Sequence, residues 1–284
     1  MINEGSIKES DVLIDGERIA KISSSITVDN NVCEIDAQGR FLIPGMIDDQ
    51  DHFREPGLTH KADLATESAA AVAGGITSFM EMPNVDPQTT NKQALRNKYG
   101  LAKDRCRANY SFYIGATNTN IEDIKSIEID DACGIKAFLG ASTGDLLVDD
   151  PEALELLFEH APIIVVTHCE DSPLIWENEK KARKKYGDDV PMSEHPYIRS
   201  DEVCYRSSRN TYELAKKYDA LLHILHLTTA KEMELFSTKH RSEKRITAEV
   251  CVHHLWFDES SYPEKGALIK CNPAIKKKTD REAL

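Results

Sequence analysis

Apolar and polar residues alternate from Ser10 to Ile26, where the chain reads SDVLIDGERIAKISSSI. The Asp15-Gly16 pair interrupts this alternation, and an Asp-Gly pair between two alternating runs is typical of a β-hairpin. Residues 1–42 are therefore predicted to form the N-terminal part of a small β-rich domain. The rhythm changes near residue 43, where a second and larger domain is predicted to begin and to continue to residue 284.

From there on, short apolar runs alternate with stretches of helical pattern. Three of the helical stretches read DLATESAAAVAGG, KQALRNKYGLAKD and PEALELLFEHA, and the first of them ends in a Gly-Gly stop. Near-continuous apolar strands joined by helices indicate a parallel sheet that is covered on both faces. Seven strands are predicted, at residues 41–48, 76–82, 109–116, 134–140, 162–170, 220–229 and 246–252.

A parallel sheet of this kind either closes into a barrel or stays open and doubly wound. Polar residues follow the ends of many different strands, which favours a barrel, because an open sheet would gather them at one switch point. The chain contains neither GxGxxG nor GxxxxGK[ST], so a phosphate-binding loop has no support. The predicted fold class is α/β, a TIM-like (β/α)8 barrel of which residues 43–284 hold about seven of the eight units.

Charge and cysteine usage narrow the classes of function. The chain has 48 acidic against 35 basic residues, a net charge of −13, so a nucleic-acid partner is not expected. No membrane partner is expected either, because no apolar run approaches the roughly 20 residues that cross a bilayer. The seven cysteines are scattered without a CxxC pair, a pattern that suits reduced thiols in the cytoplasm.

Candidate metal ligands stand at the ends of several predicted strands. The first strand runs through GMIDDQDHFREPG into Gln50 and His52, while His168 ends the fifth strand and His226 the sixth. Three histidines at the same end of three barrel strands suit zinc or a similar borderline metal. In a catalytic site such a metal keeps one position open for water, whose pKa it lowers to about 7.

The fourth predicted strand carries a lysine, Lys136, inside the apolar run GIKAFLG. An ammonium ion is costly to bury there. The lysine is therefore snorkelling or ion-paired, a Schiff-base nucleophile, or carboxylated by CO2 to give an anionic oxygen ligand. The residues alone leave these alternatives open.

Seven motifs follow one another over nearly the whole chain: HFREPG, EMPNVDPQTT, GIKAFLGASTG, VVTHCED, LHILHLTTAKE, ITAEVCVHHL and KCNPAIK. In this order they resemble the dihydroorotases of the amidohydrolase superfamily. The resemblance implies a metal-dependent (β/α)8 barrel and a small β domain built from both ends of the full-length chain. It implies reversible cyclisation of N-carbamoyl-L-aspartate to dihydroorotate in pyrimidine biosynthesis. The substrate is then a small molecule, and the oligomeric state, a homo-oligomer included, is left open.

The resemblance also assigns roles to single residues. The implied cofactor is one or two Zn²⁺ ions, bridged by a carboxylated Lys136, and the implied ligands are His52, Lys136, His168 and His226. Arg54 and Asn84 match the residues that hold the substrate carboxylate, a role that suits a guanidinium fork beside an amide. Asn272 matches a further substrate contact. His253 and His254 stand where relatives also have a His pair, which is predicted to be structural.

Two features depart from the family pattern. Gln50 occupies the position of the first histidine of HxH, and its neutral oxygen is a weaker zinc ligand than imidazole. The metal site is then weaker, or rebuilt with Asp48, Asp49 or Asp51, or Gln50 merely forms a hydrogen bond.

The second departure concerns the general base. The strand-eight aspartate that serves the family as general base would lie beyond Leu284, so no catalytic residue of that kind is expected within the chain. We expect a C-terminally truncated dihydroorotase that is weak or inactive alone.

Two other functions compete with this one. A dihydropyrimidinase or allantoinase would share the barrel, the lysine and the histidines, but its usual substrates lack the carboxylate that Arg54 would hold. A non-catalytic scaffold is suggested by Gln50, and the presence of the remaining site residues argues against it.

Overall fold

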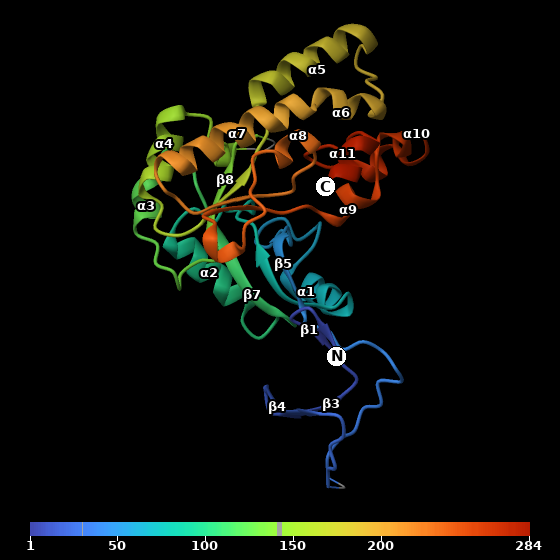
Figure 1. Ribbon diagram of the computed structural model, residues 1–284. Coiled ribbons are helices and arrows are strands. Elements are labelled where there is room, and N and C mark those ends of the chain that lie inside the picture. The colour runs from blue at the N-terminus through green and yellow to red at the C-terminus, as the bar shows by residue number, and fades with distance from the viewer. Residues whose placement is uncertain (30, 141–143) are drawn as a thin grey trace.

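A seven-stranded parallel sheet forms the centre of the computed structural model, which describes residues 1–29, 31–140 and 144–284. The strand order is β11-β10-β9-β8-β7-β6-β5, so each strand pairs with the next one along the chain. The sheet curls, and helices cover its outer side (Figure 1). The seven strands are β5 (Met46–Asp51), β6 (Ile76–Glu81), β7 (Asn109–Gly115), β8 (Gly134–Phe138), β9 (Val165–His168), β10 (Leu222–Ile224) and β11 (Ile246–Ala248).

Helices connect most successive strands, as the sequence predicts for a (β/α) barrel. The long ones begin at side-chain caps: Asp63 accepts from two backbone N–H groups at the start of α1, and Ser200 caps α7. None of the described helices combines the length and the hydropathy that a membrane span requires. The helices are α1 (Leu64–Ala73), α2 (Lys92–Ala102), α3 (Ile121–Lys125), α4 (Pro151–His160), α5 (Ser172–Tyr186), α6 (His195–Ile198), α7 (Asp201–Lys217), α8 (Ala230–Met233), α9 (Val252–Trp256), α10 (Tyr262–Lys265) and α11 (Lys278–Ala283).

The predicted N-terminal hairpin is confirmed. Strands β3 (Asp11–Asp15) and β4 (Arg18–Ser23) pair antiparallel, with Asp15 opposite Arg18 across a tight turn in which Gly16 has a φ of 58°. Two shorter strands, β1 (Ile2–Asn3) and β2 (Ser6–Ile7), form a second small sheet. The hairpin lies apart from the barrel (Figure 1), and none of its residues in β3 and β4 is buried. The division into domains at residue 42 stays a prediction.

The expected bounds of the first barrel strand are wrong. The sequence predicts a strand over 41–48, but β5 starts at Met46 and runs on through Asp51. The strand does not begin earlier because Pro44 has no backbone N–H for hydrogen bonding to a neighbouring strand. It continues further because Asp48 and Asp51 pair with β6, although the register is irregular. The polar residues from Asp48 to Asp51 therefore lie within the strand, whereas His52 and Arg54 follow it. The other six strands are confirmed but shorter than predicted, and residues 141–143 of GIKAFLGASTG lie outside the described residues.

Alternation along the strands divides the core into two layers. Phe112 and Ile114 of β7 belong to the large cluster between the sheet and its helices. Tyr113, between them in sequence, belongs instead to a smaller cluster with Val166 of β9. Successive side chains of a strand point to opposite faces, so this smaller cluster lies on the inner face of the curled sheet. The inner face is therefore packed by side chains below the strand ends.

A buried ion pair joins β6 to α2. Glu81 Oε2 lies 2.8 Å from Lys98 Nζ, and both side chains are essentially inaccessible to solvent. Lys98 Nζ also donates to the backbone oxygen of Met82 at 2.9 Å. Neither charge can be satisfied by water at this depth, so each depends on the other.

We expect a Lys98→Met substitution to lower the free energy of unfolding by about 3–5 kcal/mol, because it leaves the Glu81 carboxylate buried without its counter-charge. Urea unfolding monitored by circular dichroism measures the change. A Lys125→Met variant is the control: it breaks the exposed Lys125–Glu122 pair at 2.9 Å and should cost no more than about 1 kcal/mol. Equal losses in the two variants would contradict the prediction.

Candidate metal and substrate site at the strand ends

Three predicted metal ligands, all histidines, meet where the barrel strands end. His168 closes β9, while His226 and His52 follow β10 and β5. His168 Nδ1 lies 3.0 Å from His226 Nε2, and the two rings meet edge to face. The (β/α) topology explains this convergence, because parallel strands carry their carboxyl ends to the same side.

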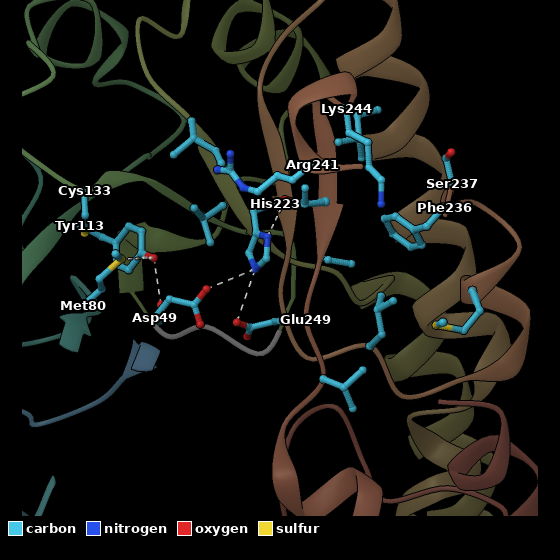
Figure 2. A pocket seen from close by; sticks show the side chains of 18 residues that line it. Asp49, Met80, Tyr113, Cys133, His223, Phe236, Ser237, Arg241, Lys244 and Glu249 are labelled. Atoms are coloured by element: carbon cyan, nitrogen blue, oxygen red, sulfur yellow. Dashed lines mark hydrogen bonds and ion pairs between the residues drawn. The ribbon is translucent and has the colours of Figure 1, made fainter. Parts of the chain in front are cut away.

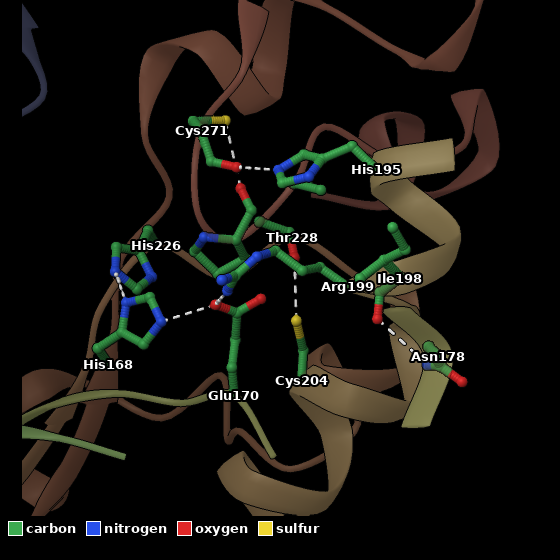
Figure 3. A network of polar contacts seen from close by, with 12 residues as sticks. His168, Glu170, Asn178, His195, Ile198, Arg199, Cys204, His226, Thr228 and Cys271 are labelled. Atoms are coloured by element: carbon green, nitrogen blue, oxygen red, sulfur yellow. Dashed lines mark hydrogen bonds and ion pairs between the residues drawn. The ribbon is translucent and has the colours of Figure 1, made fainter. Parts of the chain in front are cut away.

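Glu170 fixes the orientation of the His168 ring. Its Oε2 accepts a hydrogen bond from His168 Nε2 at 2.8 Å and forms an ion pair with Arg199 (Figure 3). Because His168 carries its proton on Nε2, its Nδ1 has a lone pair and can only accept a hydrogen bond. The proton between the two rings therefore belongs to His226 Nε2. His226 Nδ1 is then also a lone pair, buried and without a hydrogen-bond partner among the described residues.

Burial keeps the three rings neutral. Desolvation lowers the pKa of His52 to about 3, lowers that of His168 and brings that of His226 well below its ordinary value. The charge of Lys136 lowers the pKa of each ring further, so the four predicted ligands lie within electrostatic reach of one another. Neutral imidazole is the form that ligates a metal ion.

Lys136 lies in the middle of β8, and its side chain is only 1% exposed. Its Nζ stands 4.4 Å from the centre of the Phe138 ring. Burial lowers the pKa of the amine to about 7. A snorkelling lysine would reach solvent, so that alternative does not describe this side chain.

Arg54 and Asn84 lie beside His52. Asn84 Oδ1 is 2.9 Å from His52 Nδ1, so the ring donates through Nδ1 and keeps its Nε2 lone pair for another ligand. The amide NH2 of Asn84 stays available as a donor. Arg54 Nη1 approaches the backbone oxygen of Asn84 at 3.5 Å.

The Arg54 backbone has an unusual conformation. Its φ is 71°, in the left-handed region that non-glycine residues rarely adopt. Its N–H donates to Glu81 Oε1 at 3.0 Å, which ties the residue to the buried Glu81–Lys98 pair. The ion pair thus holds the predicted carboxylate clamp in a conformation it would not adopt alone.

Gln50 does not point its side-chain oxygen at an open position. Its Oε1 accepts a hydrogen bond from the Cys251 thiol at 3.2 Å. Next to it, Asp51 Oδ2 is buried without a hydrogen-bond partner among the described residues. Burial, followed by the charges of Asp48 and Glu81, raises the pKa of Asp51 to about 8, so this carboxyl is largely protonated at neutral pH. The role of Gln50 as a metal ligand stays a prediction.

The remaining predicted residues lie along the C-terminal segments. Asn272 is exposed, and no hydrogen bond joins its side chain to Arg54 or Asn84 within the described parts of the chain. His254 is buried and donates through Nε2 to the backbone oxygen of Pro273 at 3.0 Å. Potential ligand atoms of Cys251, His253 and His254 lie within 4.8 Å of one another. That the His pair is structural, and that Asn272 contacts substrate, stay predictions.

Sequence reasoning missed several residues that shape the site. Glu170 stands two residues after His168 in the motif VVTHCED, so its position in the sequence could have indicated a role in the site. Arg199 follows α5 and α6 in the chain and belongs to none of the quoted motifs, so nothing in the sequence indicated its role. A second group that could hold a metal ion lies on the wall of a cavity of about 590 Å³ (Figure 2) and consists of Asp49, His223 and Glu249. The sequence suggests Asp49 as a substitute ligand but does not single out the other two.

Three curated relatives, each named dihydroorotase, are similar over the whole chain. They come from Carboxydothermus hydrogenoformans, Bacillus cereus strain AH820 and Pediococcus pentosaceus, with identities of 31%, 30% and 29%. The chain spans 65%, 65% and 66% of their respective lengths. No protein-family model matches the chain.

Two solved structures share the fold. The L-hydantoinase (dihydropyrimidinase) of Arthrobacter aurescens has a TM-score of 0.84 at 24% identity, over 97% of this chain and 62% of its own. The dihydropyrimidinase of Brevibacillus agri has a TM-score of 0.83 at 23% identity, over 96% and 61%. The chain is thus similar over its whole length to proteins named dihydroorotase, and it shares its fold with hydantoinase and dihydropyrimidinase structures. The predicted fold is confirmed by this likeness, which at such identity concerns the fold of these cyclic amidohydrolases and not their substrates.

The neutral histidines at the strand ends predict a dependence of stability on pH. The unfolded chain takes up protons below about pH 6.5, whereas His52 in the folded chain stays neutral down to about pH 3. The unfolded state therefore binds more protons between these values, and stability falls as the pH falls. His52 alone should cost about 2 kcal/mol at pH 5 relative to pH 7.

Urea unfolding of metal-free protein at pH 7 and pH 5 measures this loss. In a His52→Gln variant, which keeps an amide beside Asn84, the loss should be smaller by about 2 kcal/mol than in the unchanged protein. Asp51 has a raised pKa, so it makes the folded state more stable as the pH falls, which is the opposite of the effect of His52. Because both proteins contain Asp51, the difference between their losses does not include its contribution. Equal losses in both proteins would show that His52 is not kept neutral by burial.

Proposed function

We propose that the chain carries the metal and substrate site of a dihydroorotase, which interconverts N-carbamoyl-L-aspartate and dihydroorotate. The observation that carries the proposal is the placement of Arg54 beside Asn84, with Asn84 bonded to His52. This arrangement puts two donors for a carboxylate next to a metal-ligand candidate. The names of the curated relatives support the same substrate class.

The residues at the strand ends fit a zinc site. His168 Nδ1 and His226 Nε2 face each other across one shared proton, and His226 Nδ1 is an unpaired buried atom. His52, Lys136, His168 and His226 would hold one or two Zn²⁺ ions, and Gln50 is a further candidate. When bound, zinc supplies a water of lowered pKa and polarises the amide carbonyl.

Carboxylation of Lys136 suits its surroundings. Only the neutral amine reacts with CO2, and burial lowers the pKa of Lys136 to about 7, so a substantial neutral fraction exists at physiological pH. The product is an anion, which would offset the cost of gathering metal charge in this buried place. The modification of Lys136 thus follows from the proposed zinc site.

The residues of this chain divide the remaining work. Arg54 and the Asn84 amide would bind and orient the substrate carboxylate, with Asn272 as a further contact. Glu170 and Arg199 hold the His168 ring in its tautomer. Desolvation keeps the three histidines neutral, so each ring has one nitrogen lone pair.

A hydantoinase or dihydropyrimidinase activity is the second candidate, because the solved structures with this fold include proteins with those names. The substrate carboxylate separates the two candidates. Dihydroorotate carries one, whereas hydantoin and dihydrouracil do not, and these would leave the Arg54 guanidinium unpaired in a half-buried position.

We expect zinc-loaded protein to bind dihydroorotate more tightly than dihydrouracil, and Arg54→Ala to weaken dihydroorotate binding about ten- to hundred-fold, since a hydrogen bond to a charged group contributes about 1.5–3 kcal/mol. Calorimetric titration measures the affinity, and zinc content should not change. Arg96→Ala, which removes an exposed arginine of α2, is the control. If Arg54→Ala kept full affinity, or dihydrouracil bound equally well, the second candidate would be favoured.

Glu170→Gln should weaken zinc binding about 10–100-fold, because the amide cannot replace the carboxylate that orients His168 and raises its basicity. Competition with a chromophoric chelator measures the affinity. The control is Glu177→Gln on the surface of α5, which loses only the exposed pair with Lys181 at 2.7 Å. An unchanged zinc affinity in Glu170→Gln would remove His168 from the proposed ligand set.

A further inference from the structure

Glu55 follows directly on Arg54 in the loop after β5, and it is buried. Its Oε2 accepts a hydrogen bond from the backbone N–H of Leu64, the first residue of α1, at 3.0 Å. A buried carboxylate also requires a partner for its charge and for its second oxygen. That partner comes from a segment 50 residues further along the chain.

Arg105, which follows α2, is the partner of Glu55. Its Nη1 donates to Glu55 Oε1 at 2.7 Å and its Nη2 donates to Oε2 at 3.2 Å, so the guanidinium and the carboxylate form a bidentate pair. Nη1 also donates to the backbone oxygen of Leu101 at 3.2 Å, which orients the guanidinium. The pair therefore joins the loop after β5 to the start of α1 and to the end of α2.

With this pair, the chain is held on both sides of Arg54. Before it, the side chain of Phe53 is buried in the large hydrophobic cluster. At Arg54 itself, the backbone N–H donates to Glu81. After it, Glu55 is bound by Arg105. A φ of 71° is unfavourable for a residue with a side chain, so Arg54 keeps this conformation only while its neighbours are held in place.

The loop after β5 is also joined to the loop after β6, which carries Asn84. The backbone N–H of Asp86 donates to the backbone oxygen of Pro56 at 3.1 Å. The next residue, Gly57, lies so close to this second loop that a Cβ in its place would stand 1.9 Å from the backbone oxygen of Asp86. A displacement of the first loop would therefore disturb the second, so both halves of the predicted carboxylate clamp depend on it.

We propose that Glu55 and Arg105 are positioning residues of the carboxylate clamp. Their bidentate pair holds Arg54 in the conformation that places its guanidinium beside Asn84, and it thereby sets the affinity of the site for a substrate carboxylate. Neither residue is assigned a contact with substrate, and both act through Arg54, as supporting residues around a preorganised site do. The inference rests on the proposed function for the identity of the ligand.

The competing role for the pair is purely structural. Glu55 and Arg105 would then tie α1 to α2 without any effect on Arg54. Loss of the pair lowers stability in either case, so stability does not separate the two roles. The preference for a ligand with a carboxylate does separate them, because only the positioning role acts through Arg54. Dihydroorotate and dihydrouracil differ in this carboxylate and are therefore the matched probes.

Calorimetric titration of zinc-loaded protein with each probe compares the unchanged 284-residue chain with Arg105→Met. The variant should bind dihydroorotate at least about tenfold more weakly, since misplacing a binding group by about 1 Å can cost on the order of 100-fold. Its zinc content and its affinity for dihydrouracil should not change. Equal dihydroorotate affinity in the two proteins, or an equal weakening of both probes, would overturn the proposal.

Two further variants show whether the bidentate geometry matters. Arg105→Lys keeps the charge but lacks the planar fork, so it should recover only part of the lost affinity. Glu55→Gln keeps an oxygen for the Leu64 N–H but loses the charge, so it should resemble Arg105→Met. The control is Arg107→Met, which removes an exposed arginine two residues further on and should bind both probes like the unchanged protein.

Crystal structures of the unchanged protein, Arg105→Met and Glu55→Gln test the positioning without any ligand. In both variants Arg54 Nη1 should lie farther from the backbone oxygen of Asn84 than its 3.5 Å in the unchanged chain. An Arg54 with the same backbone conformation in all three structures would overturn the proposal. If the unchanged protein did not bind dihydroorotate, the proposed function would fail, and these structures would still decide whether the pair positions Arg54.

Discussion

The pairing of Glu81 with Lys98 is the constraint on which the first part of the site depends. A carboxylate and an ammonium ion buried together cannot be separated without leaving a charge in an apolar medium. Glu81 uses its second oxygen for the Arg54 backbone, and Arg54 in turn reaches Asn84. A buried ion pair contributes little net stability, but this pair fixes the position of the backbone. It determines where the chain leaves β5 and enters the loop that would contact a substrate.

The second part of the site depends on burial. The histidines are neutral because solvent is excluded from them, and Lys136 shares their environment. Glu170 keeps its charge there because the hydrogen bond from His168 and the charge of Arg199 outweigh its desolvation, and its pKa stays below the ordinary value. The Glu170 carboxylate thus stays ionised next to the neutral histidines. This suits a place that is to receive a cation, because the net positive charge of the loaded site is partly offset in advance.

The sequence predicts best what depends on local interactions. Alternation around Gly16 yields the hairpin, and caps such as Asp63 mark the helix starts, because both are decided within a few residues. The strand-end histidines converge because every βα unit repeats the same direction. The bounds of β5 could not be read in this way, since Asp48 and Asp51 look like loop residues unless the curled sheet is known to receive them. Likewise, Arg199 meets Glu170 from 29 residues away, and Cys251 meets Gln50 across 201 residues. Such pairs depend on the curvature of the sheet, which leaves no mark on a single stretch of sequence.

That separation in sequence has a consequence for the order of folding. Each strand of the sheet pairs with the next along the chain, so the sheet can grow by short steps from β5 toward β11. The hydrogen bond between Gln50 and Cys251, and the approach of Asp49 to within 4.8 Å of Glu249, close a loop that contains nearly all of those steps. Loop-closure entropy is paid before such distant contacts stabilise the chain, so they form late. The same contacts should be among the first to open, while the neighbouring strands are still paired.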